Sequence, residues 1–148
     1  MNPLSKVNFI VVHCADTKSN MDVTVSDLHQ WHVAENGWSD IGYHFFVKFN
    51  GLRFECRSTS YQGAHCKQVN DKSVAICLEG GFGGANNFTE LQLDSLFELL
   101  SSLKVQHPNA AVVGHNHFDP KQCPCFDVTK WYEDKLTLEN TKAFGSWL

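Results

Sequence analysis

The sequence lacks an excess of positive charge, and this absence limits what the protein can bind electrostatically. Lys and Arg together number 12 against 16 Asp and Glu, so the formal net charge is -4. Proteins that bind nucleic acid or an anionic membrane surface do so largely through clustered Lys and Arg. We therefore expect no nucleic-acid partner, and we expect a polymeric substrate to be held mainly by neutral contacts.

The sequence also lacks a long apolar run. No stretch approaches the roughly 18 apolar residues of a membrane span, and the segment from Met1 to Lys6 has no apolar region of a signal peptide. We expect no membrane insertion, and we expect synthesis in a cytosol without a signal peptide. In that reducing compartment the six cysteines are predicted to be free thiols or metal ligands rather than disulfides.

Repeats and low-complexity tracts are absent as well, and a chain of 148 residues has room for one compact domain. With 43% hydrophobic and 19% charged residues, the composition is that of a globular protein. We therefore predict a single domain over residues 1–148, and we expect it to be a monomer.

Strand and helix patterns alternate along the chain. Short apolar, β-branched runs predict strands, and two of them flank Asn50-Gly51, a dipeptide suited to a tight hairpin turn. Capping patterns mark three helix starts, and a glycine-rich loop over residues 80–87 is expected to border a cleft. The alternation predicts an α/β fold with a mixed central sheet flanked by helices. The predicted strands cover residues 7–12, 43–47, 52–56, 74–78 and 111–113, and the predicted helices begin at Thr24, Thr89 and Asp127.

Two of the predicted strands end at a histidine. These are His13 and His115, and a loop bounded by prolines just after the second supplies Cys123. Strand ends are where α/β folds usually place ligands. Two imidazoles and one thiolate are a known catalytic zinc set, which leaves a fourth position open for water, whereas a structural zinc would want four protein ligands.

Spacing alone leaves the ligand set open. His117 can replace His115, and Cys125 can replace Cys123, because residues two apart share one face of an extended chain. A lone His at a strand end is more often a satisfied polar residue than a ligand, and a lone Cys usually belongs to the core.

Two further side chains suit catalysis. Lys121 lies two residues before Cys123, so in an extended loop its ammonium would face the metal and stabilise an oxyanion. Tyr43 opens a predicted strand and would donate a hydrogen bond or shuttle a proton beside the metal. Its neighbour His44 points to the opposite face of that strand.

A series of motifs occurs in order over residues 7–132. They are Phe9-Ile10-Val11-Val12-His13-Cys14, Gln30-Trp31-His32, Gly37-Trp38, Gly42-Tyr43-His44-Phe45, Leu78-Glu79-Gly80-Gly81, Gly114-His115 and Pro120-Lys121-Gln122-Cys123-Pro124. In these motifs the chain resembles the phage lysozyme type of N-acetylmuramoyl-L-alanine amidase, within the superfamily that includes peptidoglycan recognition proteins.

The resemblance implies specific roles for these residues. It implies one catalytic Zn²⁺ held by His13, His115 and Cys123, with Tyr43 and Lys121 catalytic, and it implies that His117 and Cys125 are not ligands. The implied reaction is hydrolysis of the peptidoglycan amide that joins N-acetylmuramic acid to L-alanine. From the family's wall-binding surface we expect four substrate contacts: Trp38, His65, Lys67 and Asn70. The alternative for Trp38 is that its ring packs in the core.

Two positions depart from the family's pattern. Ala75 stands where Ser-x-Gly is common, and Cys125 creates a Cys-Pro-Cys where a small residue is usual. Neither change removes a predicted functional group. Cys125 does place a second thiol near the metal, which is open to oxidation or to alternative ligation.

The resemblance favours a phage endolysin, made in the host bacterial cytoplasm and acting on the cell wall after release. A cytosolic amidase that trims recycled muropeptides would share the same fold and chemistry. The remaining alternative is a non-catalytic peptidoglycan-binding module, and Cys123 argues against it, because binding-only members are expected to lack the thiolate ligand.

Overall fold

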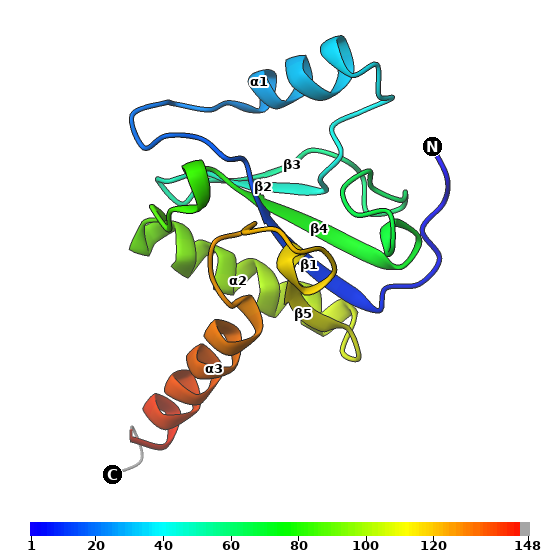
Figure 1. Cartoon of the computed structure of the whole chain (residues 1–148). Helices are drawn as coiled ribbons and strands as arrows, with labels where there is room; N and C mark the ends of the chain where they lie inside the picture. Colours follow the sequence, from blue (N-terminus) through cyan, green and yellow to red (C-terminus); the bar gives the residue numbers. More distant parts are fainter. Residues whose placement is uncertain (146–148) are drawn as a thin grey trace.

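The computed structural model describes residues 1–145, in which a five-stranded sheet has helices on both faces (Figure 1). The strand order is β3-β2-β4-β1-β5. Strands β2, β4, β1 and β5 run parallel, and β3 pairs antiparallel with β2 at the edge. The predicted mixed α/β architecture is therefore confirmed. The strands are β1 (Phe9–Cys14), β2 (Phe45–Val47), β3 (Arg53–Glu55), β4 (Ser73–Leu78) and β5 (Ala111–Gly114).

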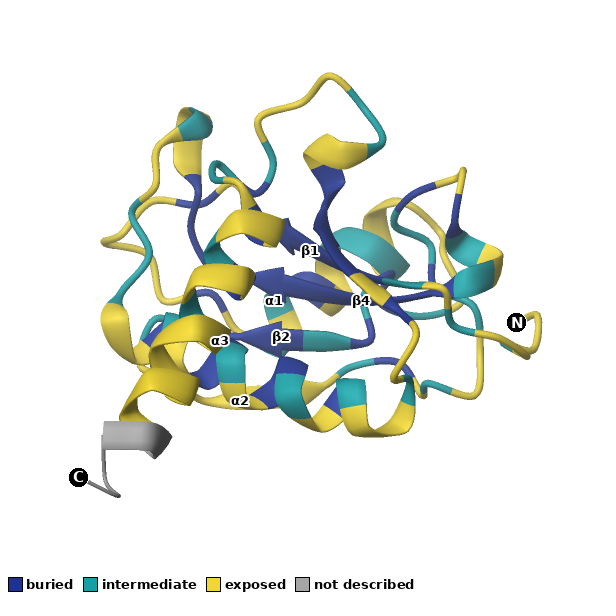
Figure 2. Cartoon of the chain, turned by 90° about the horizontal axis from the view of Figure 1, so that it is seen from below, coloured by how far each residue is buried: buried dark blue, intermediate teal, exposed yellow. Residues whose placement is uncertain are grey.

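The main core lies between the sheet and the helices α2 (Glu90–Gln106) and α3 (Val128–Gly145). Ile10 and Val12 of β1 are fully buried on this side, whereas Val11 belongs to a cluster on the other side. Figure 2 shows the two central strands largely buried, with β4 buried throughout and β1 buried after Phe9, whereas the outer surfaces of the helices are exposed. Because strand side chains alternate between faces, His13 shares the face of Val11 and points away from the main core.

The opposite face is covered by α1 (Val25–His29), by its continuation and by the loop before β4. The predicted capping box is present, because the Thr24 hydroxyl accepts from the Asp27 amide and the Asp27 carboxylate accepts from the Thr24 amide. Beyond α1 the chain continues as a π-helical segment (Gln30–Glu35), where the Asn36 amide donates to the Trp31 carbonyl. The single predicted helix is thus present but changes its hydrogen-bond pattern partway.

The other two predicted helix starts are also confirmed. Thr89 and Gln92 form a reciprocal capping box at α2, and the Asp127 carboxylate accepts from the Lys130 amide at the start of α3. None of the helices within residues 1–145 is both long and apolar enough to cross a bilayer.

The predicted hairpin forms, with a longer turn than a two-residue connection. The Gly51 amide donates to the Lys48 carbonyl, and the Lys48 amide donates to the Leu52 carbonyl. Only Gly51 of this turn has a positive φ, of 87°, which is the pattern of a type I turn followed by a bulge. β1 also ends later than predicted, so His13 is the penultimate residue of the strand and is fixed by its pairing with Cys77 of β4.

Candidate active site

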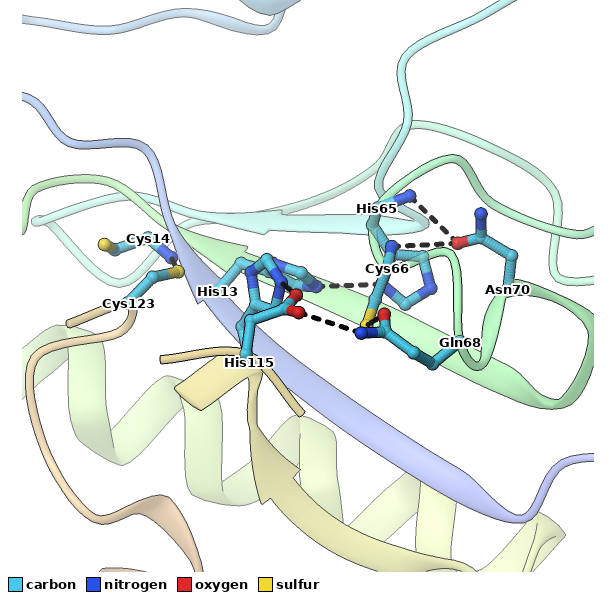
Figure 3. A network of polar contacts seen from close by, with 9 residues as sticks. His13, Cys14, His65, Cys66, Gln68, Asn70, His115 and Cys123 are labelled. Atoms are coloured by element: carbon cyan, nitrogen blue, oxygen red, sulfur yellow. Dashed lines mark hydrogen bonds and ion pairs between the residues drawn. The ribbon is translucent and has the colours of Figure 1, made fainter. Parts of the chain in front are cut away.

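The ends of β1 and β5 bring two histidines together. These strands are parallel neighbours, so their carboxyl ends meet at one edge of the sheet. His13 is buried near the end of β1, and His115 is buried directly after β5. Their ring centroids lie 4.6 Å apart, and Figure 3 shows the two rings side by side with Cys123 approaching from a loop.

Hydrogen bonds leave one nitrogen of His13 available. The Ser73 hydroxyl donates to the Val69 carbonyl at 2.6 Å, so the Ser73 oxygen accepts from His65 Nε2 at 3.0 Å. His65 Nδ1 is then unprotonated and accepts from His13 Nε2 at 2.8 Å. Nδ1 of His13 therefore carries a free lone pair. Burial, followed by the charges of His65, His115 and Lys121, lowers the pKa of His13 and keeps its ring neutral.

His115, like His13, has its Nε2 in a hydrogen bond. Its Nε2 donates to the Asp119 carboxylate at 2.7 Å, which leaves Nδ1 as the available nitrogen. Asp119 is itself held by the Gln68 amide at 2.8 Å. A carboxylate behind a histidine is the usual support of a metal-binding imidazole, because it fixes the tautomer and strengthens the ring as a ligand.

Cys123 completes a group of three candidate ligands. One ligand atom each from His13, His115 and Cys123 lies within 4.8 Å of the others. The Cys123 sulfur accepts a hydrogen bond from the Cys14 amide at 3.1 Å. Two imidazole nitrogens and one sulfur meet the donor requirement of a catalytic zinc site.

His117 and Cys125 do not belong to this group of three. The chain turns directly after Gly114 into a 3-10 segment (His115–His117), so His117 lines a different cavity and makes an edge-to-face contact with Phe118. Cys125 has a positive φ of 78°, and its sulfur lies 4.0 Å from that of Cys14. Residues two apart share one face only in an extended chain, and both segments are turns instead.

Lys121 and Tyr43 lie at the same site. Lys121 lines the cleft together with His115, and its charge contributes to the lowered pKa of His13. The loop that carries it is a series of bends rather than the extended segment assumed from the sequence. The Tyr43 ring packs 5.1 Å from that of His13. Burial, followed by the neighbouring Cys77 and Cys123, raises the pKa of Tyr43, so its hydroxyl stays protonated and acts as a hydrogen-bond donor.

A cleft of about 480 Å³ opens over His115, Asp119 and Lys121. All four substrate-contact candidates line it. Trp38 is 38% exposed, which disfavours a purely core role for its ring, and Lys67 is exposed. His65 and Asn70 already form hydrogen bonds within the protein. The His65 ring bonds to His13 and Ser73, and the Asn70 side-chain oxygen accepts from the amides of His65 and Cys66.

Reasoning from the sequence missed three supporting side chains: Asp119, Gln68 and Ser73. The only available signal was the spacing of four residues between His115 and Asp119, which is too common to single out a pair. Sequence reasoning interpreted His44 correctly as pointing elsewhere. Its Nδ1 accepts the Ala75 amide and its Nε2 donates to the Tyr61 carbonyl, so this buried ring has a structural role.

Acid is expected to destabilise the metal-free protein through His65. Burial, followed by the charges of His44 and His115, lowers the pKa of His65 to about 3, against 6.5 ordinarily. Between these values the unfolded chain binds a proton that the folded protein does not. The stability contributed by neutral His65 is therefore complete above about pH 6.5 and is lost as the pH falls towards 3.

Urea unfolding of the apoprotein measures this effect. Between about pH 7 and pH 5, His65 should account for a loss of about 2 kcal/mol in the free energy of unfolding. His65→Gln should remove that part of the pH dependence, whereas His29→Gln, at an exposed position, should leave it unchanged. Equal slopes for wild type and His65→Gln would contradict the assignment.

Comparison with known proteins identifies relatives over most of the chain. The family model described as N-acetylmuramoyl-L-alanine amidase matches residues 3–126. The endolysin of Klebsiella phage KP32 is 42% identical over 128 residues, covering 84% of each chain. The endolysin of Escherichia phage T7 is 39% identical over 128 residues, again covering 84% of each chain.

Solved structures show the same fold. The N-acetylmuramoyl-L-alanine amidase LysC from Clostridium intestinale superposes with a TM-score of 0.78 at 28% identity, covering 92% of this chain and 91% of its own. Drosophila PGRP-LB superposes with a TM-score of 0.72 at 25% identity, covering 84% and 81% respectively. The match to the family model, the phage relatives and the shared fold agree, and the chain belongs to the N-acetylmuramoyl-L-alanine amidase family.

Proposed function

We propose that this chain is a zinc-dependent endolysin that hydrolyses the amide bond between N-acetylmuramic acid and L-alanine in peptidoglycan. One observation carries the zinc site: His13 and His115 each use Nε2 in a hydrogen bond, which leaves Nδ1 of each ring available, and one ligand atom from each ring and the Cys123 sulfur lie within 4.8 Å of one another. Family membership and phage endolysins at about 40% identity support the activity.

The donor set fits a zinc ion. His13, His115 and Cys123 would hold it, His65 and Asp119 would keep the two imidazoles in the ligating tautomer, and the Cys14 amide would support the thiolate. When bound, zinc supplies Lewis acidity that activates water and polarises the scissile carbonyl.

The protein's own residues supply positioning and charge. Lys121 lines the cleft together with His115, and its ammonium would stabilise negative charge developing on the carbonyl oxygen. The protonated Tyr43 hydroxyl would donate a hydrogen bond that orients the same group. Trp38 and Lys67 would contact the sugar or peptide on the cleft wall, and we propose that the protein acts as a monomer.

Product analysis tests the function. Incubation of purified peptidoglycan with the zinc-loaded protein should release new L-alanine amino groups without new reducing sugar ends. Loss of turbidity in permeabilised cells would support the endolysin role, since we propose synthesis in the host cytoplasm and action on the wall after release. Activity restricted to soluble muropeptides would indicate a recycling amidase, and binding without any new amines would indicate a recognition module.

Asp119→Ala is expected to weaken zinc binding by about 10- to 100-fold, because removing the carboxylate frees the His115 ring. Competition with a chromogenic chelator measures the zinc Kd of the variant. His117→Ala is the matched control, because this nearby histidine faces another cavity and should leave the Kd unchanged. The prediction is wrong if Asp119→Ala binds zinc as tightly as wild type.

A further inference from the structure

Three cysteines converge beside the candidate metal site from two distant segments. Cys14 ends β1, whereas Cys123 and Cys125 belong to the loop between β5 and α3. The Cys14 and Cys125 sulfurs lie 4.0 Å apart, although the two residues are 111 positions apart in the sequence. Both side chains line a cavity of about 320 Å³ next to the Cys123 loop.

Gly81 makes this approach possible. A Cβ atom at Gly81 would lie 2.6 Å from the Cys14 sulfur and 3.2 Å from the Cys125 sulfur, so both sulfurs pack directly on the glycine. A disulfide requires a sulfur–sulfur distance of about 2.0 Å, so the two atoms must move together by about 2 Å. Rotation of the Cys125 side chain within the cavity that it lines supplies such a movement.

Cys123 is the competing partner for Cys14. Its sulfur accepts the Cys14 amide and groups with His13 and His115. Under the proposed function this thiolate is a zinc ligand in the loaded protein, and it is therefore not available for a disulfide. The sulfurs of the other three cysteines are directed elsewhere: Cys56 to the Phe54 carbonyl, Cys66 to the Gln68 side chain and Cys77 to the Leu78 carbonyl.

We propose that Cys14 and Cys125 form a redox pair, which a small-molecule disulfide such as oxidised glutathione converts into a disulfide that ties β1 to the Cys123 loop. Cys125, the more exposed of the two, loses its proton and attacks one glutathione sulfur. This step breaks the glutathione disulfide and releases one glutathione. The Cys14 thiolate then attacks the Cys125 sulfur and releases the second, so two protein thiols are oxidised and one glutathione disulfide becomes two thiols.

The position of the bond gives it a consequence for the site. Cys14 directly follows the ligand candidate His13, and Cys125 lies two residues after Cys123. The bond would therefore hold together the two segments that carry these ligands. It would also restrict the unfolded chain over a long loop, which raises stability. Only the effect on zinc rests on the proposed function, since formation of the bond does not require activity.

The experiment compares the zinc-loaded protein before and after incubation with oxidised glutathione. The incubation is run at about pH 8.5, because the thiolate is the attacking species. Peptide mapping by mass spectrometry should find a Cys14–Cys125 link. The Tm should rise by roughly 5–10 °C, and dithiothreitol should reverse the rise. Zinc release to a chelator should become slower.

Two variants separate this pair from general oxidation. Cys125→Ser should show neither the link nor the rise in Tm. Cys56→Ser should behave as wild type, because the Cys56 sulfur contacts the Phe54 carbonyl and not this pair. Absence of the link, a link from Cys14 to Cys123, or an unchanged Tm in the linked protein would overturn the proposal. A Cys14–Cys125 link in a protein that binds no zinc would support the redox pair and refute the proposed function.

Discussion

Cys123→Ser is expected to lose both zinc and hydrolysis. The neutral serine hydroxyl replaces the thiolate, the only anionic ligand of the group formed with His13 and His115. Loss of the metal removes several kcal/mol of transition-state stabilisation, so kcat/KM should fall by at least about a thousandfold. Metal analysis by mass spectrometry, together with release of L-alanine amines from peptidoglycan, measures the two effects on the same sample.

Cys125→Ser is the matched control for this variant. In the wild type, the Cys125 sulfur is directed towards Cys14 and the Gly81 carbonyl rather than towards the two histidines. Under reducing conditions the control should keep one zinc ion per chain and wild-type activity. Loss of zinc from Cys125→Ser, with retention in Cys123→Ser, would show that the ligand assignment is reversed.

Lys121→Met is expected to lower kcat by about 10²- to 10³-fold while zinc remains bound. Methionine preserves most of the side chain's length but removes the ammonium beside His115, which we propose stabilises the developing oxyanion. Zinc should stay bound while kcat falls, because Lys121 is not one of the three candidate ligands. Steady-state kinetics on a soluble muropeptide and metal analysis give the two readouts.

Lys67→Met provides the contrast for Lys121. Both lysines line the same cleft, but we propose a role in the chemical step for Lys121 alone. Lys67→Met should therefore raise KM with little change in kcat, because it removes a binding contact only. A wild-type kcat in Lys121→Met, or loss of its zinc, would refute the oxyanion role.

The Cys14 and Cys125 thiols both have a raised pKa. A hydrogen bond to Cys123, followed by burial, raises the pKa of the Cys14 thiol, and burial raises that of Cys125 to about 12. Both thiols are thus protonated near neutral pH.

Much of the fold could be predicted from local patterns. The apolar runs located all five strands, and the two capping boxes and the cap at Asp127 located the three helix starts. Such patterns are reliable because they reflect local physics: alternation of buried side chains, and satisfaction of free amides at helix starts. Boundaries were less predictable, as with β1, whose end is set by pairing with β4 rather than by its own residues.

The candidate site was likewise predictable in part from the sequence. Residue chemistry alone pointed to two histidines and a cysteine, and strand patterns placed His13 and His115 at one sheet edge. Periodicity could not choose between His115 and His117 or between Cys123 and Cys125, because it treats the chain as extended. The tertiary structure separates them: the chain turns after Gly114 and again at Cys125, so that only one member of each pair faces His13.

The hydrogen bonds that support the candidate metal ligands depend wholly on tertiary structure. His65 reaches His13 from 52 residues away, and Cys14 reaches Cys123 from 109 residues away. No local pattern encodes such contacts, because they arise only when the sheet forms and brings the end of β1 beside the loop before β4 and the loop after β5. The amino-acid sequence dictated which donors exist, and the folded chain determined which of their lone pairs remain free for a metal.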